Sequence, residues 1–191
     1  MAKSVTPVKR VAYILQAGLV HAMMGLFRIM PVQWASATGG AVARIIGPML
    51  PATGRAKVNL KMALPDRGEA HTRIIRDMWA NIGRTLGEYP HLSRLAAHNT
   101  VIEGRQILDR LKASDKPAIL FSAHLANWEI PGACMVLNGV DLDLVYRAPN
   151  NPYVQGLLNR ARSLNGRIGT IPKSDTGTRQ LVKSLRQGRN I

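Results

Sequence analysis

Residues 117–130 read PAILFSAHLANWEI, and this stretch decides how the chain can fold. The apolar run 117–121 predicts a short buried strand that continues to residue 123. His124 then stands where the strand ends, and Glu129 follows at the start of the next helix. Because open α/β sheets hold ligands at the carboxyl ends of their strands, a histidine here is placed to remove a proton from a hydroxyl group at neutral pH.

The spacing of His124 and Glu129 leaves two geometries open. On one continuous helix the two side chains would stand about 140° apart and could not meet. If His124 lies on the loop and Glu129 in the first turns, where the helix dipole favours an acid, the carboxylate can orient the imidazole and stabilise its charged form. Asn127 could position a polar group of a substrate or cap the helix. A hydrogen-bonded structural histidine is the alternative interpretation.

The segments after residue 100 alternate between strand and helix patterns. A short extended segment begins at Val101, strands are expected at 117–123, 142–146 and 167–171, and helices at 106–112, 127–138, 152–164 and 175–187. Alternation with short loops is typical of a parallel sheet with right-handed crossovers. The predicted fold class is therefore α/β, with N-terminal helices followed by strands and helices that form a mostly parallel sheet.

The first part of the chain is predicted to be helical. Helices are expected at 11–30 and 32–47, a short one opens at 55–60, a turn follows at Pro65-Asp66, and an amphipathic helix covers 69–89. The last of these has apolar residues at helical spacing, which predicts a buried face. The residues of that face are Ile74, Ile75, Met78, Trp79, Ile82 and Leu86.

The stretch 11–30, VAYILQAGLVHAMMGLFRIM, is largely apolar. A membrane-spanning helix needs about 20 apolar residues, but Gln16, His21 and Arg28 also fit a helix that lies in the membrane interface. A core helix of a soluble protein is the third interpretation. We expect residues 1–30 to be a membrane-associating segment of a single domain, 1–191, whose α/β catalytic portion is 101–191.

The net charge of +15 is concentrated at the two ends of the chain. Residues 1–65 hold eight Lys and Arg and no acid, 66–146 hold nine bases and ten acids, and 147–191 hold nine bases and one acid. Residues 1–10, with Lys3, Lys9 and Arg10, are expected to form a basic tail. Basic ends suit phospholipid headgroups, phosphorylated glycolipids, acidic proteins or nucleic acid, and a basic surface kept for solubility is the alternative.

Several kinds of site are not indicated. Nucleic-acid recognition has only charge in its favour, so no nucleic-acid partner is predicted. The other histidines, at 21, 71, 91 and 98, form no metal-binding spacing, and no glycine-rich nucleotide loop occurs, so the sequence indicates neither a metal nor a cofactor. The single Cys134 lies in an apolar run and is expected to be buried, which fits a reducing compartment.

Residues 124–129, HLANWE, resemble the His-(any four)-Asp/Glu motif of the lipid A biosynthesis acyltransferases. Matches to the same family follow in consistent order along nearly the whole chain. They are Asn59-Leu60 with Leu64-Pro65-Asp66, the loop 146–152 (YRAPNNP), and Ile171-Pro172-Lys173 with Arg179 and 185–188 (LRQG). Members of the family are longer, and the last predicted helix ends where a further strand is expected, which would leave an open sheet edge. We therefore expect a chain truncated at its C-terminus.

The resemblance implies a glycerolipid acyltransferase-like fold and an enzyme at the cytoplasmic face of the inner membrane. Such an enzyme moves a fatty acyl group from acyl carrier protein to a hydroxyl of an anionic lipid A precursor. His124 would act as the base and Glu129 would orient it. The substrate-binding residues would be Asn127, Arg147, Asn150, Asn151 and Lys173.

Arg147 would bind a phosphate or steady the oxyanion, with a surface ion pair as the alternative. Two other functions stay open at this point. One is a related membrane acyltransferase with another glycolipid or an aminolipid as acceptor. The other is a non-catalytic membrane-binding fragment.

Overall fold

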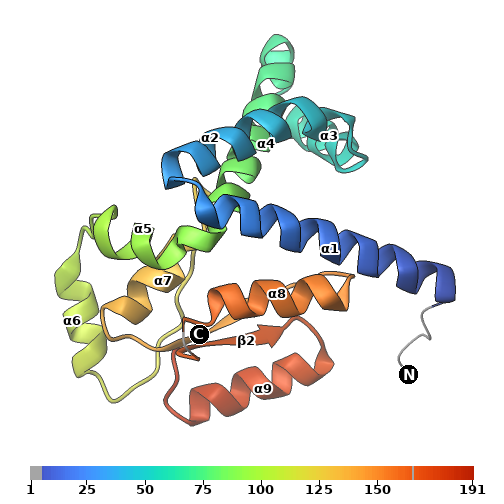
Figure 1. Cartoon of the computed structure of the whole chain (residues 1–191). Helices are drawn as coiled ribbons and strands as arrows, with labels where there is room; N and C mark the ends of the chain where they lie inside the picture. Colours follow the sequence, from blue (N-terminus) through green and yellow to red (C-terminus); the bar gives the residue numbers. More distant parts are fainter. Residues whose placement is uncertain (1–5, 165) are drawn as a thin grey trace. The chain divides into compact units, whose positions relative to one another are not determined.

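The computed structural model describes residues 6–164 and 166–191 (Figure 1). The first five residues of the expected basic tail, with Lys3, and Asn165 at the end of the expected helix 152–164 lie outside the described residues. The chain divides into two compact units, which are described separately. The sheet unit comprises Met1–Gly25, Leu92–Ala123 and Glu129–Ile191, and the helical unit comprises Leu26–His91 and His124–Trp128.

The elements are mostly helices. Along the chain they are α1 (Pro7–Ile29), α2 (Val32–Ile46), η1 (Gly47–Met49), α3 (Ala52–Ala63), η2 (Pro65–Ala70), α4 (His71–Glu88), η3 (Tyr89–His91), α5 (Leu92–His98), α6 (Arg105–Ala113), α7 (Ile130–Leu137), β1 (Leu142–Tyr146), α8 (Pro152–Arg162), β2 (Ile168–Pro172) and α9 (Asp175–Arg186). The sequence predicts most of these within a few residues. It does not predict α5, and it places a turn where the 3₁₀ helix η2 forms.

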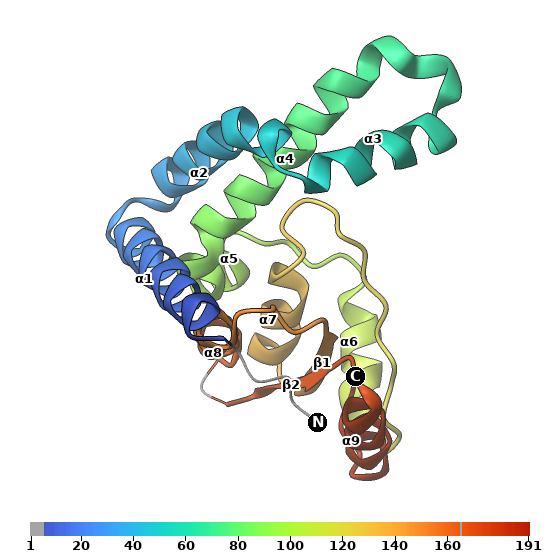
Figure 2. The ribbon, with the colours of Figure 1, turned by 90° about the vertical axis from the view of Figure 1, so that its right-hand side faces the viewer.

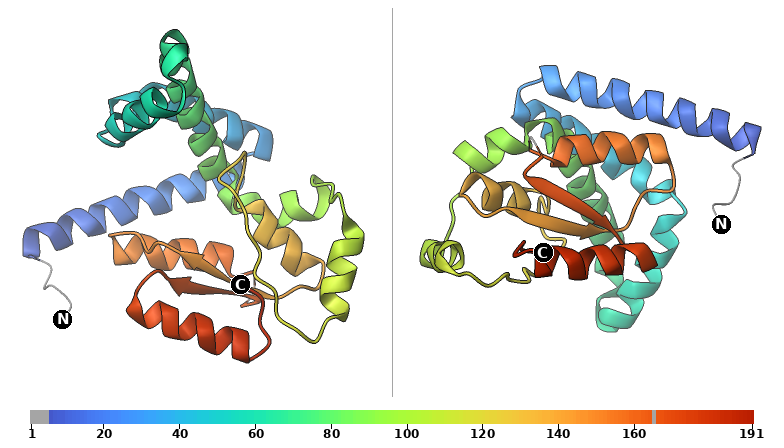
Figure 3. Two further views of the ribbon diagram at one scale, coloured as in Figure 1. Left: turned by 180° about the vertical axis from the view of Figure 1, so that it is seen from behind. Right: turned by 90° about the horizontal axis from the view of Figure 1, so that it is seen from below.

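The sheet unit is built on the parallel pair β1 and β2. Their register runs from Leu142 opposite Ile168 to Tyr146 opposite Pro172. Figures 1 and 3 show α8 on one face of this pair, with α1 beyond it, and α9 on the opposite face. The α/β class is therefore confirmed, although the sheet is small and the chain is mostly helical.

Apolar side chains fill the sheet unit in the usual way. Val136, Leu142 and Ile168 form one buried cluster, and Ala133 and Cys134 belong to another. Cys134 is buried as predicted, and its Sγ lies 3.8 Å from the carbonyl oxygen of Ala96. Burial raises the pKa of the Cys134 thiol, against a smaller opposing effect of a hydrogen bond with Thr100. The thiol is thus kept neutral inside the core.

The predicted strand 117–123 is wrong. These residues have no regular secondary structure, and Phe121 is 93% exposed. The backbone N–H of Ile191 donates to Ala118 (3.0 Å), and Leu120 donates to Ile191 (2.7 Å). A strand needs a neighbour along several residues, and this segment finds one only at Ile191. The extended segment expected at Val101 does not form a strand either.

Residues 190–191 lie between that segment and β1. On the other side of Ile191, Asn190 forms a parallel bridge with Leu142, and the N–H of Asp143 donates to the carbonyl of Asn190 (2.9 Å). Arg189 strengthens this junction, because its Nε (3.0 Å) and Nη2 (2.6 Å) both donate to the Asp143 carboxylate. The spatial order is therefore 118–120, 190–191, β1 and β2.

The helical unit is held together by small residues. Figure 2 shows α2 and α3 beside α4. A Cβ atom added to Gly83 would stand 2.1 Å from the carbonyl oxygen of Gly39, and one added to Gly87 would stand 2.2 Å from that of Ala35. The backbones of α2 and α4 therefore touch directly, as in helix pairs with small-xxx-small motifs.

This close approach changes which residues of α4 are buried. Of the predicted apolar face only Ile75 is fully buried, and the others are half-buried. Bulky apolar side chains lie on the outside instead. On α2, η1 and α3 these are Trp34, Val42, Ile45, Ile46, Met49, Val58 and Met62. The sequence periodicity correctly predicts the helix α4. It does not predict the face of α4 that contacts α2, because glycine and alanine make that contact.

Helix α1 is apolar on both faces. Ala17, Met24 and Phe27 are buried. The opposite side exposes a stripe at helical spacing, which consists of Val8, Val11, Leu15, Leu19, Leu26 and Ile29. By length and composition alone this 23-residue helix can cross a membrane, and only 17% of its apolar window is buried. This exposure favours the membrane-associating interpretations, which stay predictions.

Candidate functional site

The loop His124–Trp128 precedes α7 and is not helical. Ala126 has a φ of 45°, in the left-handed region that disfavours residues with a Cβ. The strained turn is held from α4, because the carbonyl of Ala126 accepts from Asn81 Nδ2 (2.8 Å) and Thr85 Oγ1 (3.5 Å). The predicted helix 127–138 consequently begins only at Ile130.

Asn127 is held by the same face of α4. Its Nδ2 donates to Glu88 Oε2 (2.6 Å), while the hydroxyl of Ser36 donates to Oε1 of the same carboxylate (2.6 Å). Asn81, Thr85 and Glu88 follow at four- and three-residue spacing, so they share one side of α4. The sequence reasoning treated this helix as core and missed these three residues. Polar residues at helical spacing were the available signal.

Asn127 is not the N-cap residue of α7. The N-cap residue is Glu129, and its side chain makes no capping hydrogen bond. The substrate-binding role of Asn127 stays a prediction.

His124 is exposed at the start of this loop. Its ring centroid lies 5.2 Å from that of Trp128, with 37° between the planes. His124 lies outside the helix and Glu129 directly before it. His124 and Glu129 therefore do not lie on one continuous helix, and the pairing of their side chains stays a prediction.

Glu129 is almost fully buried, with 7% of its side chain exposed, and it pairs with Arg162 of α8. The guanidinium binds it through two atoms, Nε to Oε2 (2.8 Å) and Nη2 to Oε1 (2.5 Å). Arg162 also lies 5.7 Å above the ring of Tyr146. The sequence reasoning missed Arg162, because nothing in its local pattern distinguishes it from other helix-end arginines. This bidentate pair fixes the carboxylate in place.

The carboxyl ends of β1 and β2 carry two basic residues. Arg147 follows β1 and Lys173 follows β2, and the N–H of Lys173 donates to the carbonyl of Tyr146 (2.8 Å). Both side chains are exposed. Neither forms an ion pair with any residue that the structure describes, so the surface ion pair considered for Arg147 is not seen. Two cations at this edge suit an anionic ligand.

Asn151 is buried and caps α8. Its Oδ1 accepts from the N–H groups of Tyr153 (3.0 Å) and Val154 (3.4 Å). Its Nδ2 donates to the carbonyl of Tyr13 (2.8 Å) and to Gln16 (3.3 Å), which ties the loop to α1. These bonds give Asn151 a structural role. Its neighbour Asn150 is exposed and lines an open groove of about 790 Å³ between that loop and α1, and substrate binding by either residue stays a prediction.

Comparison with known proteins decides the family. The family model of the bacterial lipid A biosynthesis acyltransferases matches residues 4–191. The chain belongs to the bacterial lipid A biosynthesis acyltransferase family. Among its curated relatives are lipid A biosynthesis acyltransferase 2 of Shigella flexneri and the lipid A biosynthesis myristoyltransferase of Escherichia coli (strain K12). Each is 22% identical over 139 residues, which cover 70% of this chain.

The aligned part covers 44% and 42% of these two lipid A acyltransferases, so the match extends over less than half of each relative. No solved structure matches the chain significantly. The predicted family is thereby confirmed, while the roles of the motif 124–129 and of the loop 146–152 stay predictions. The more specific expectation of a glycerolipid acyltransferase-like fold stays a prediction.

Proposed function

We propose that this chain is an acyltransferase that moves a fatty acyl group from acyl carrier protein to a hydroxyl of a lipid A precursor. The observation that carries the proposal is the loop His124–Trp128, which presents an exposed histidine and is bound to α4 through three side chains. This histidine begins the stretch 124–129 that resembles the His-(any four)-Asp/Glu motif of the family, and membership of the family supports the proposal.

The chemistry requires one base. The imidazole of His124 takes the proton of the acceptor hydroxyl while the hydroxyl oxygen attacks the carbonyl carbon of the thioester. The tetrahedral intermediate then expels the thiolate as the C–S bond breaks, and the imidazolium returns its proton to the sulfur. The products are an ester and a free carrier thiol, so no other nucleophile is needed.

Glu129 acts in this scheme as a positioning residue. Its carboxylate, fixed by Arg162, orients the imidazole and stabilises the charged form that appears during transfer. Arg147 and Lys173 supply the positive charge for the acceptor phosphates or the oxyanion, and Asn127 and Asn150 contribute polar contacts. The chain functions as a single acyltransferase domain in this proposal, with 101–191 as its catalytic portion.

The bilayer supplies the acceptor. The exposed apolar stripe of α1 and the absence of acids from residues 1–65 support attachment through residues 1–30 to the cytoplasmic face of the inner membrane.

The direct test is acyl transfer by membrane preparations of the protein with acyl carrier protein as donor. His124→Ala should lower the rate about a hundredfold or more, which is the usual scale for loss of a general base. The matched control is His98→Ala, an exposed histidine at the end of α5, which should retain the normal rate. A folded His124→Ala protein with near-normal transfer would exclude His124 as the base.

Acceptor choice separates the remaining functions. Lipid A precursors should be acylated in preference to other glycolipids and to aminolipids, and the opposite order would indicate a related membrane acyltransferase. A wild-type chain that binds membranes but transfers no acyl group to any of them would be a non-catalytic membrane-binding fragment.

The role of Glu129 has its own test. Glu129→Asp should retain part of the rate and Glu129→Gln much less, with the loss in kcat rather than in KM. Arg162→Gln is the structural comparison, because it breaks the same ion pair but leaves the carboxylate. Equal losses in Glu129→Gln and Arg162→Gln would mean that the ion pair, and not the orientation of His124, is what matters.

A further inference from the structure

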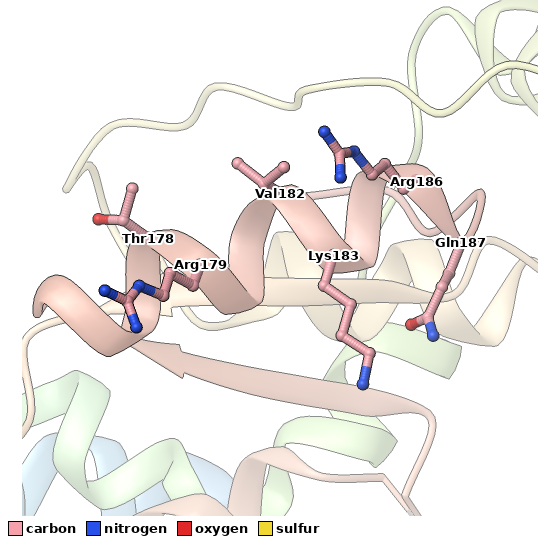
Figure 4. A pocket seen from close by; sticks show the side chains of 6 residues that line it. All are labelled: Thr178, Arg179, Val182, Lys183, Arg186 and Gln187. Carbon is pink, nitrogen blue, oxygen red and sulfur yellow. The ribbon is translucent and has the colours of Figure 1, made fainter.

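The outer face of α9 is basic. Arg179, Lys183 and Arg186 follow at four- and three-residue spacing, and all three are exposed. Val182, which is 42% exposed, lies among them. Figure 4 shows these side chains extending from the helix, from Thr178 near its start to Gln187 just beyond its end. We call this surface the α9 face.

The α9 face has the form of a shallow groove. The six side chains in Figure 4 enclose a space of about 420 Å³ whose lining is mostly apolar. Long basic side chains produce such a surface because their aliphatic stems lie along it while their charged ends reach water. The combination of an apolar floor with charged margins fits an amphipathic partner that carries carboxylates around an apolar side chain.

Among the described residues, the three cations have no carboxylate partner. Arg162, Arg167 and Arg189 in the same part of the chain each pair with an Asp or Glu. Arg179, Lys183 and Arg186 form no ion pair with any residue in 6–164 or 166–191. Asp175 is the one acid between residues 147 and 191. Unpaired positive charge of this kind steers an acidic partner during its approach.

The position of α9 favours a protein over a membrane as that partner. Within the sheet unit, α9 covers the face of the β1–β2 pair opposite to α8 and α1 (Figures 1 and 3). Because α1 carries the exposed apolar stripe, a bilayer that binds α1 approaches the other side of the sheet. The α9 face is thus left towards the aqueous phase.

We infer that the α9 face is the docking surface for the acidic carrier protein that delivers the acyl group. This inference rests on the proposed function, since that function supplies the carrier as donor. The carboxylates of the carrier pair with Arg179, Lys183 and Arg186, and an apolar side chain of the carrier packs on Val182. Docking on α9, at the end of the sheet unit's chain, leaves the α1 side free for the lipid acceptor.

Charge reversal tests the surface directly. The variant is Arg179→Glu with Lys183→Glu, and the matched control is Arg105→Glu with Arg110→Glu, two exposed arginines on α6. Binding of labelled acyl carrier protein to the full chain is measured by fluorescence anisotropy. The α9 variant should bind about tenfold or more weakly at low salt, as expected for loss of steering charges, and the control should bind like the wild type. At high salt the wild type, the α9 variant and the control should bind the carrier with similar affinity, because exposed charges are then screened.

A second measurement separates this inference from the proposed function. Transfer from acyl carrier protein should show a KM raised about tenfold in the α9 variant, while transfer from acyl-pantetheine, which has no protein surface, should be unchanged. A wild-type chain that transfers no acyl group overturns the proposed function, and the anisotropy experiment still tests docking. Unchanged carrier binding by the α9 variant overturns the inference. Loss of sedimentation with phosphatidylglycerol vesicles, with carrier binding intact, would assign the α9 face to the membrane instead.

Discussion

The helical unit and the sheet unit bury opposite kinds of residue: small ones in the helical unit and large apolar ones in the sheet unit. In the helical unit Gly39 and Gly83 lie inside and touch through their backbones, while Ile45 and Met49 are 72% and 81% exposed. In the sheet unit Val136 and Leu142 are buried, at 0% and 3% exposure. Moving large apolar side chains out of water is favourable, and their burial in the sheet unit is the pattern that soluble proteins show.

The helical unit has the pattern of a protein in lipid. Where both surroundings are apolar, helices associate through close backbone contact, and small residues gather at the interface. Large apolar patches on the outside then mark a surface that meets lipid or another protein. The exposed apolar residues of α2, η1 and α3 are therefore a candidate surface of the helical unit for contact with lipid or with another protein. Four predictions test this difference by comparing substitutions in the two units.

The largest effect is expected for Gly83→Leu. The new Cβ would stand 2.1 Å from the carbonyl of Gly39 and 2.5 Å from the Cβ of Ala43. Overpacking at such a contact should destabilise the helical unit by about 3 kcal/mol, measured as thermal unfolding in detergent.

The control for that substitution is Gly54→Ala in α3, which has no atom within 4 Å of the new Cβ. It should be neutral or stabilise by about 0.5–1 kcal/mol, because alanine is the better helix former. A Gly83→Leu protein as stable as Gly54→Ala would mean that α2 and α4 do not pack through their backbones.

The next effect is expected for Asp143→Asn in the sheet unit. Burial alone would raise the pKa of Asp143, but hydrogen bonds from Arg189 and Ser184 and the charge of Arg189 outweigh it and lower the pKa. Because the pKa of Asp143 is lowered, the ion pair stabilises the fold at pH values above the unfolded-state pKa of about 4. This contribution is lost as the pH falls through the folded-state pKa.

At neutral pH Asp143→Asn should cost about 2 kcal/mol, less than a fully buried pair because Arg189 is partly exposed. The asparagine variant should also lack the loss of stability on acidification that the wild type shows, as followed by circular dichroism. Asp77→Asn, in the exposed pair with Arg44, should cost under about 1 kcal/mol. Equal costs at Asp143 and Asp77 would remove the distinction between the two pairs.

The third prediction compares apolar residues of the two units. Val136→Ala should destabilise the sheet unit by about 1.5 kcal/mol, since two buried methyl groups are lost. Ile45→Ala should change stability by less than about 0.5 kcal/mol, because that side chain is exposed. Both are measured by denaturant unfolding in the same detergent. A larger loss for Ile45→Ala than for Val136→Ala would show that the exposed apolar residues of α2 form a core after all.

The smallest effect concerns α1. Leu15→Gln with Leu19→Gln places two amides on its exposed stripe and should lower partition into anionic vesicles about tenfold, or 1.4 kcal/mol. Val101→Gln with Ile107→Gln changes two exposed apolar residues elsewhere in the sheet unit and should leave partition unchanged. Vesicle sedimentation that is the same for both variants would mean that α1 is not what attaches the protein.

Local pattern predicts the elements well but not their partners. The alternation in 142–146 gives β1 to the residue, and the capping signals give α9 nearly so. The segment 117–123 has the composition of a strand, but in the described part of the chain its hydrogen-bond partners are Asn190 and Ile191, some 70 residues away. A local sequence pattern cannot predict a contact between residues that lie so far apart in the sequence.

In the candidate site, too, the local sequence indicates individual residues but not the partners that hold them. The sequence proposes His124, Glu129, Arg147 and Lys173 because each lies at a predicted end of an element, although the strand predicted before His124 does not form and the roles of the four residues stay predictions. The groups that hold them in place could not be found. Glu88 reaches Asn127 and Arg162 reaches Glu129 across 39 and 33 residues, which only the folded chain brings together.

The position of residues 190–191 between 118–120 and β1 has a consequence for the order of folding. Ala118 donates to the side chain of Asn190, 72 residues later, and contacts between such distant residues form slowly because a long loop must be closed first. We therefore expect residues 118–120 to be fixed late, after β1, α8, β2 and α9 have brought residues 190–191 into position. Residues 118–120 would then be among the last parts of the sheet unit to become ordered, and a chain in which folding stalls at β2 or α9 would leave them without the partner that residues 190–191 supply.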